Sequence, residues 1–121
     1  MKNSVTIEGQ DSPLLANILY DVLVEGEKAQ EKHGTPSPNP LRGITILTEE
    51  VGEAAEAALK ATSLNEKEKE DEHGVAQPMG YWLVRLRAEL VQTASVSIRQ
   101  IQNIDNGRMH KCLKDQEISE S

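Results

Sequence analysis

Hydrophobic side chains recur at helical spacing in three segments of the chain. In the first, residues 11–32, they lie three and four positions apart and form a stripe along one side of a helix. The stripe consists of Leu14, Leu15, Ile18, Leu19, Val22 and Leu23. The same period predicts a second helix over residues 40–62 and a third from about residue 78 to residue 106. The pattern indicates an all-α fold, because only the first eight residues offer a candidate strand.

Residues that begin and end helices support these limits. Asn39 is placed to cap the second helix, and Pro40 would occupy its first position, where the missing N–H has no intrahelical partner. Pro78 opens the third helix, and Asn106 and Gly107 end it. The boundaries of the second and third helices are therefore predicted from local chemistry.

Three further segments differ from the helices in composition. Residues 33–40, HGTPSPNP, carry proline at alternate positions and are predicted to form an extended connector. The charge run NEKEKEDEHG, residues 65–74, is more simply a solvated loop than an extension of the second helix. Residues 107–121 are expected to form a weakly ordered tail. We therefore predict one domain over residues 1–121, with a core at about 11–106.

The composition indicates how these helices would pack. The chain of 121 residues contains no Phe, and its aromatic residues are Tyr20, Tyr81 and Trp82. Small aliphatic side chains suit closely packed helices but give a thin core. The third helix is apolar on several sides, which is typical of a helix buried in a bundle or subunit interface. We therefore expect a homodimer or a dimer of dimers.

Charge and targeting signals narrow the functional classes. A formal net charge of −7 argues against a nucleic-acid partner, which usually meets a basic face. Cys112 is the single cysteine, so an intramolecular disulfide is excluded and a reducing compartment is expected. No stretch approaches the roughly 18 apolar residues of a membrane span, and no signal peptide is apparent. The expected localisation is cytoplasmic.

The phrase L-x-x-E-Φ-x-[E/Q]-x-A occurs twice, at residues 47–55 and 86–94. Its polar positions are Glu50 and Glu53 in the first copy, and Glu89 and Gln92 in the second. On a helix, i,i+3 spacing places both members of each pair on one face, within otherwise apolar stripes. Glu56 lies further round the second helix, where it would pair with Lys60 on a solvated surface.

Buried carboxylates cost several kcal/mol unless they are paired or bound to a metal. Converging glutamates with few nearby cations therefore suggest a hard cation such as Mg²⁺, which prefers oxygen ligands. The alternative is that these are surface glutamates of amphipathic helices, and for a single pair this alternative is favoured. Two matched copies leave both interpretations open.

Other metal chemistry fits the sequence less well. A carboxylate-bridged di-iron bundle requires Glu-x-x-His pairs, whereas Glu53 and Gln92 occupy the fourth positions here. His33, His73 and His110 all lie outside the two motifs, and no zinc spacing is present.

With Glu49, Glu50 and Glu53 as EExxE and Glu89 opening ExxQ, the chain resembles the MazG-like, all-α nucleoside triphosphate pyrophosphohydrolases over about residues 11–106. The resemblance implies an oligomeric helical bundle with a Mg²⁺ site between two helices, with Mn²⁺ as an alternative ion. It also implies hydrolysis of a nucleoside triphosphate to the monophosphate and pyrophosphate, as in nucleotide-pool house-cleaning. Glu50, Glu53 and Glu89 match the metal ligands. Glu49 matches a water-orienting base or second-metal ligand.

Gln92 departs from the family pattern, which usually has Asp at this fourth ligand position. A glutamine keeps an oxygen donor but removes a charge, which would weaken metal affinity. It would mark either a specialised branch or an inactive relative. The alternative function is therefore a non-catalytic helical oligomer, a binding or scaffold protein with a decayed site.

The substrate base is not identified by the sequence. His33 and Trp82 are candidates for stacking on a nucleotide base, although each residue type is more often found in a connector or in packing. Arg85 and Arg99 are candidate phosphate contacts, but exposed arginines are common on helices.

Overall fold

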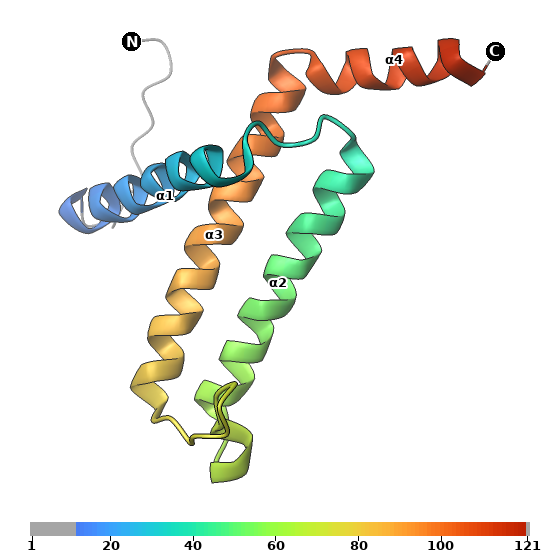
Figure 1. Cartoon of the computed structure of the whole chain (residues 1–121). Coiled ribbons are helices and arrows are strands. Elements are labelled where there is room, and N and C mark those ends of the chain that lie inside the picture. Colours follow the sequence, from blue (N-terminus) through green and yellow to red (C-terminus); the bar gives the residue numbers. More distant parts are fainter. Residues whose placement is uncertain (1–11, 121) are drawn as a thin grey trace.

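The computed structural model of the chain describes residues 12–120, and these residues form an all-helical fold (Figure 1). The four α-helices are α1 (Ser12–His33), α2 (Pro40–Thr62), α3 (Met79–Asp105) and α4 (Arg108–Glu120). Within the described residues the only β-type pairing is an isolated bridge between Glu70 and Ala76. The all-α prediction is confirmed, while the strand considered for the first eight residues lies outside the described part.

The predicted helix limits are confirmed where local signals supported them. The Asn39 side chain accepts hydrogen bonds from the backbone N–H groups of Leu41 and Arg42, at 2.9 and 3.3 Å, and Pro40 is the first residue of α2. Helix α3 begins directly after Pro78, and the chain turns at Gly107, where a φ of 80° suits glycine.

The helices are arranged around α3, which packs against α1, α2 and α4. Helices α2 and α3 lie side by side and run in opposite directions, so that they form the main body of the molecule (Figure 1). Helix α1 crosses the half of α3 that is nearer to α4 (Figure 1). None of the helices within residues 12–120 has the length and apolar character needed to cross a membrane.

The charge run lies in the connection between α2 and α3, as predicted. It contains a short 3₁₀-helix, η1 (Glu66–Lys69), whose residues are largely exposed. Two hydrogen bonds link this connection to the helix pair. Lys60 Nζ on α2 donates to the Glu70 carbonyl at 2.7 Å, and Trp82 Nε1 on α3 donates to the Lys69 carbonyl at 2.9 Å.

The segment after Gly107 differs from its prediction, because it forms α4 rather than a weakly ordered tail. Met109 is buried and anchors the first turn of this helix. Exposed ion pairs from Lys111 to Asp115 and from Lys114 to Glu117 add support along its surface. Each such pair contributes only about 0.2–0.5 kcal/mol, so the local pattern after Gly107 predicts a helix only weakly.

The core is thin, as the composition indicated. Its buried apolar residues are Val22, Ala54, Ala57, Ala61, Trp82 and Met109. Many larger apolar side chains remain exposed, including Leu19 and Leu23 on α1 and Val84, Leu90 and Ile101 on α3. A single copy of the chain therefore leaves much of the apolar circumference of α3 uncovered.

Candidate metal centre

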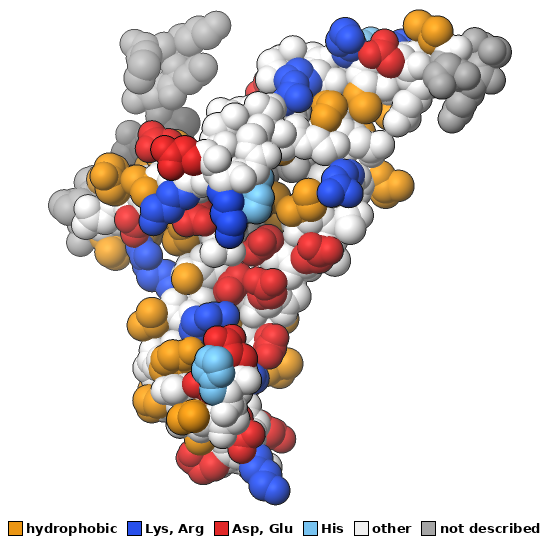
Figure 2. Space-filling view, in the orientation of Figure 1, with side chains coloured by type: hydrophobic (Ala, Val, Ile, Leu, Met, Phe, Trp, Pro, Cys, Tyr) orange, Lys and Arg blue, Asp and Glu red, His pale blue; other side chains and the backbone are white. Residues whose placement is uncertain are grey.

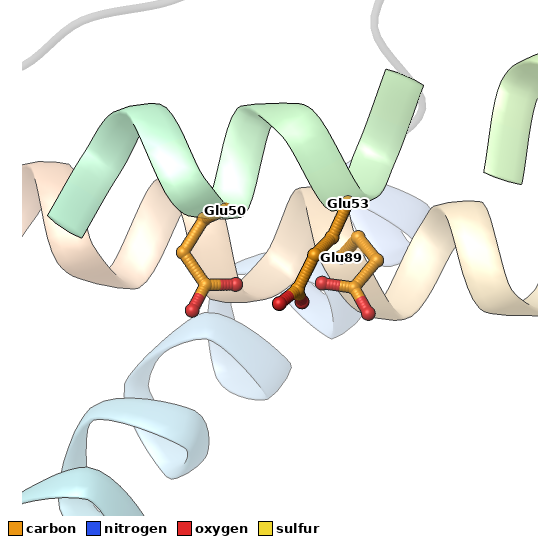
Figure 3. Close-up of side chains that lie close together, drawn as sticks. All are labelled: Glu50, Glu53 and Glu89. Atoms are coloured by element: carbon orange, nitrogen blue, oxygen red, sulfur yellow. The ribbon is translucent and has the colours of Figure 1, made fainter. Parts of the chain in front are cut away.

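Three glutamates converge between α2 and α3. One carboxylate oxygen from each of Glu50, Glu53 and Glu89 lies within 4.8 Å of the other two (Figure 3). The i,i+3 spacing places Glu50 and Glu53 on the side of α2 that meets α3. Glu56, one turn further along, is exposed and pairs with Lys60 at 3.2 Å. The predicted convergence of the three glutamates, and the outward position of Glu56, are confirmed.

The three carboxylates differ in exposure. Glu89 is buried, with 6% of its surface exposed, Glu50 is half-buried, and Glu53 is exposed. One oxygen of Glu50 and one of Glu89, Oε2 in both cases, is inaccessible and has no hydrogen-bond partner. The cation nearest to Glu89 is Arg85, at 3.7 Å from Oε1, which is a long contact. The cluster therefore contains buried acceptor oxygens that the protein itself leaves unsatisfied.

The crowding changes the protonation of the cluster. Burial is the largest cause of a rise in the pKa of Glu89 to about 7, and the neighbouring Glu53 and Glu50 raise it further, against the opposing charge of Arg85. Burial also raises the pKa of Glu50, and the charge of Glu53 adds to this effect. A proton on Glu89 would relieve the repulsion among the carboxylates. A bound cation would relieve the same repulsion.

The donor set fits a hard divalent cation. All three groups offer carboxylate oxygens, which are the ligands that Mg²⁺ and Mn²⁺ prefer. The three oxygens lie within 4.8 Å of one another, and the flexible glutamate side chains would have to move closer together to hold one ion. Glu50, Glu53 and Glu89 are the residues that would hold the ion.

A cavity of about 670 Å³ adjoins the cluster and shares Glu50 with it. The cavity lies between α1, the 34–39 connector, α2 and α3. Its basic side chains are Lys28, Lys32, His33, Arg42 and Arg99. Figure 2 shows acidic side chains over the middle of the α2–α3 pair, with basic side chains gathered next to them towards the connector. The site thus joins unsatisfied carboxylates to a cavity whose lining includes these basic side chains together with the acidic Glu25.

Most of the basic side chains that line the cavity are not predicted as site residues from the sequence. Lys28 and Lys32 are i,i+4 neighbours on α1, a spacing that indicates a shared face. Nothing in the sequence places that face opposite Arg42, because their convergence depends on how α1 crosses the other helices. Lys28, Lys32 and Arg42 therefore emerge only from the structure.

The remaining predicted site residues fall into two groups. Gln92 and His33 line the cavity, Gln92 on the α3 side and His33 at the end of α1. Glu49 is exposed on α2 and lies outside the three-carboxylate cluster, although its charge also contributes to the raised pKa of Glu50. Arg85 contacts Glu89 rather than standing free for phosphate.

Trp82 belongs to the packed core rather than to the cavity. Only 5% of its surface is exposed, and it clusters with Ala57 and Ala61. Lys60 Nζ lies 4.6 Å from the centroid of its ring, and the Tyr81 ring meets it edge-on at 4.9 Å. These contacts correct the suggestion that Trp82 stacks on a nucleotide base, and they support the packing alternative.

Comparisons with models of protein families, with curated proteins and with solved structures found no match for the chain.

Proposed function

We propose that the chain is a divalent-metal-dependent nucleoside triphosphate pyrophosphohydrolase, which converts its substrate and water to a nucleoside monophosphate and pyrophosphate. One observation carries the proposal: a cluster with unsatisfied carboxylate oxygens shares Glu50 with a cavity whose lining includes Lys28, Lys32 and Arg42. Carboxylates suit a metal ion, and basic side chains suit the phosphates that such an ion accompanies. A metal ion on the carboxylates and basic side chains in the cavity would together allow a protein of net charge −7 to bind a polyanion.

The protein side of the mechanism follows from the positions of the residues. Glu50, Glu53 and Glu89 would hold Mg²⁺ or Mn²⁺, and Gln92 would add a neutral oxygen donor. When bound, the ion supplies charge neutralisation of the triphosphate and a more acidic bound water. Lys28, Lys32 and Arg42 would hold phosphate oxygens and so orient the triphosphate of the substrate for in-line attack by water. Glu49, on the exposed side of α2, is proposed as the base that orients the water.

The MazG-like resemblance supports the same assignment through its motif residues, EExxE at 49–53 and Glu89. It also supports a homodimer or a dimer of dimers. Exposed apolar side chains on α1 and α3 provide an independent reason to expect self-association. So many exposed leucine and isoleucine side chains are unfavourable in water and are typical of an interface. His33 at the cavity wall is the remaining candidate for contact with the base. A house-cleaning role in the nucleotide pool would place the protein in the cytoplasm.

A non-catalytic helical oligomer is the second candidate, and Gln92 is the observation that favours it. An amide in place of a carboxylate lowers the negative charge available to the ion. In this alternative the exposed apolar surfaces serve assembly, and the three glutamates are a remnant.

The two candidates are separated by a screen of ribo- and deoxyribonucleoside triphosphates with Mg²⁺ or Mn²⁺, in which pyrophosphate release is measured. The enzyme proposal expects metal-dependent release that Glu53→Gln and Glu89→Gln each reduce by on the order of 100-fold, as for loss of a metal ligand. Glu56→Gln is the matched control, because Glu56 lies on the same helix but faces solvent. Absence of release from every triphosphate, with a folded protein, would contradict the enzyme proposal.

A further inference from the structure

The cavity wall formed by the 34–39 connector depends on donors from α3. Pro36 and Pro38 have no backbone N–H, so this segment cannot satisfy its own carbonyl groups as a helix would. Two side chains on α3 supply donors: Arg99 Nη2 donates to the Gly34 carbonyl at 2.9 Å, and Asn103 donates to two carbonyls further along. Asn103 Nδ2 lies 3.3 Å from the Pro36 carbonyl oxygen and 3.2 Å from that of Ser37, and only 2% of the residue is exposed.

The amide of Asn103 is in turn oriented by α4. Arg108, the first residue of α4, donates from Nη1 to Asn103 Oδ1 at 2.7 Å. A charged donor on the amide oxygen strengthens the opposite N–H groups, because hydrogen bonds in a chain polarise one another. It also fixes which end of the amide faces the connector. Asn103 can therefore donate to the two carbonyls only in the orientation that Arg108 favours.

Arg108 is itself held firmly in place. Its backbone N–H donates to Asn106 Oδ1 at 3.1 Å, Gly107 makes the turn between the helices, and the adjacent Met109 is buried. The side chain thus projects from the fixed end of α4 towards the connector.

On its other side, the connector is continuous with the start of α2. The backbone N–H of Asn39 donates to Ser37 Oγ at 3.2 Å, and Asn39 Oδ1 accepts from the backbone N–H of Arg42 at 3.3 Å. A chain of hydrogen bonds therefore extends from α4, through Asn103 and the connector, to the turn of α2 that carries Arg42. Arg42 lines the cavity.

We infer that Arg108 is a positioning residue for the cavity: by orienting Asn103 it holds the connector and, through it, Arg42, so that α4 supports anion binding without touching the ligand. The inference rests on the proposed function only in taking a polyphosphate as the ligand. The hydrogen-bond chain itself involves neither the carboxylates nor a metal.

The experiment uses the full chain with Arg108→Ala, Arg108→Lys and Asn103→Asp. Lys111→Ala is the control, because it removes a positive charge from an exposed site on the same helix. Asn103→Asp retains the side-chain size and the pairing with Arg108 but removes the donors to the connector. Amide hydrogen exchange over residues 34–42 and calorimetric binding of inorganic triphosphate are measured without metal. KM and kcat are measured for the best nucleotide with Mg²⁺.

Arg108→Ala and Asn103→Asp are expected to increase exchange over residues 34–42 and to weaken triphosphate binding about three- to tenfold. KM should rise by a similar factor with kcat nearly unchanged, because the metal ligands stay in place. Arg108→Lys should restore most of the affinity, and Lys111→Ala should match wild type. If Arg108→Ala does not fold, Asn103→Asp decides alone.

Unchanged exchange over 34–42, or increased exchange with unchanged triphosphate affinity, would overturn the positioning role. A fall in kcat of about three- to tenfold with unchanged KM in Arg108→Ala and Asn103→Asp would also overturn it. If no nucleotide is hydrolysed, the proposed activity fails, while the exchange and triphosphate measurements still decide the role of Arg108.

Discussion

Glu53 on α2 and Glu89 on α3 face each other across the helix pair, and their nearest carboxylate oxygens lie within 4.8 Å of each other and of Glu50 (Figure 3). Glu89 is buried while Glu53 reaches solvent. Repulsion among the carboxylates and the burial of Glu89 favour the addition of a proton or a cation to the three glutamates.

The first prediction concerns the pH dependence of stability in metal-free protein. The pKa of Glu89 is raised from 4.5 to about 7 on folding. Because the folded state binds the proton more tightly, this contribution to stability is fully present below pH 4.5 and is lost as pH rises through 7. Wild type should therefore lose stability relative to Glu89→Gln between these values. Denaturant unfolding at several pH values in a chelator measures the difference.

Millimolar Mg²⁺ should reduce this loss in wild type, because the ion replaces the proton and stabilises the folded state. It should leave Glu89→Gln nearly unchanged. If the difference in free energy of unfolding between wild type and Glu89→Gln does not vary with pH, the pKa of Glu89 is not perturbed by its surroundings.

The second prediction concerns Gln92. Gln92→Asp should tighten Mg²⁺ binding by on the order of tenfold, because an added carboxylate strengthens the attraction to a hard cation. Glu53→Gln should weaken binding and sharply lower turnover. Calorimetric titration gives the affinity, and pyrophosphate release gives the turnover.

The contrast between these variants also separates the two candidate functions. If wild type binds no divalent ion at millimolar concentration and Gln92→Asp restores binding, the non-catalytic oligomer is supported, and Gln92 is the substitution that disabled the site.

The third prediction concerns the close approach of α2 and α3 at Gly43. A Cβ built on Gly43 would lie 2.1 Å from Gln100 Oε1, and Gln100 is buried in the cavity wall. Gly43→Ala should therefore displace Gln100 and destabilise the protein by about 1–3 kcal/mol, as overpacking does. Thermal and denaturant unfolding measure the change.

A second variant tests the cause. In Gln100→Ala the obstruction is removed, so adding Gly43→Ala should instead stabilise by up to about 1 kcal/mol, the helix preference for alanine over glycine. Gly52→Ala is the matched control on α2, because no atom lies within 4 Å of a Cβ built there. Destabilisation of equal size in both backgrounds would exclude the contact with Gln100 as its source.

The fourth prediction is that the chain self-associates as a homodimer or a dimer of dimers. Leu90 and Ile101 are each 53% exposed on α3, so replacing both with Glu should dissociate the oligomer if this face is covered by a second copy. Leu64→Glu is the control, since Leu64 is fully exposed in the α2–α3 connection. Sedimentation at micromolar concentration measures the result. A compact wild-type monomer would contradict the shared apolar interface.

Features that depend on a few neighbouring residues can be predicted from the sequence alone. Asn39 and Pro40 specify the start of α2 because an N-cap satisfies N–H groups within its own first turn. The i,i+3 spacing of Glu50 and Glu53 follows from the helical repeat alone. Even the approach of Glu89 could be predicted, because apolar stripes on two helices indicate which faces meet.

The surroundings of those glutamates, in contrast, depend on how the helices pack. The wall containing Lys28, Lys32 and Arg42 depends on the angle at which α1 crosses α3, and no local pattern encodes that angle. Trp82 is buried because the α2–α3 connection folds over it and supplies the Lys69 carbonyl. The role of Arg108 likewise requires the turn that brings α4 back to Asn103. Helices form from local backbone hydrogen bonds, whereas a site forms from side chains that converge only when the helices pack.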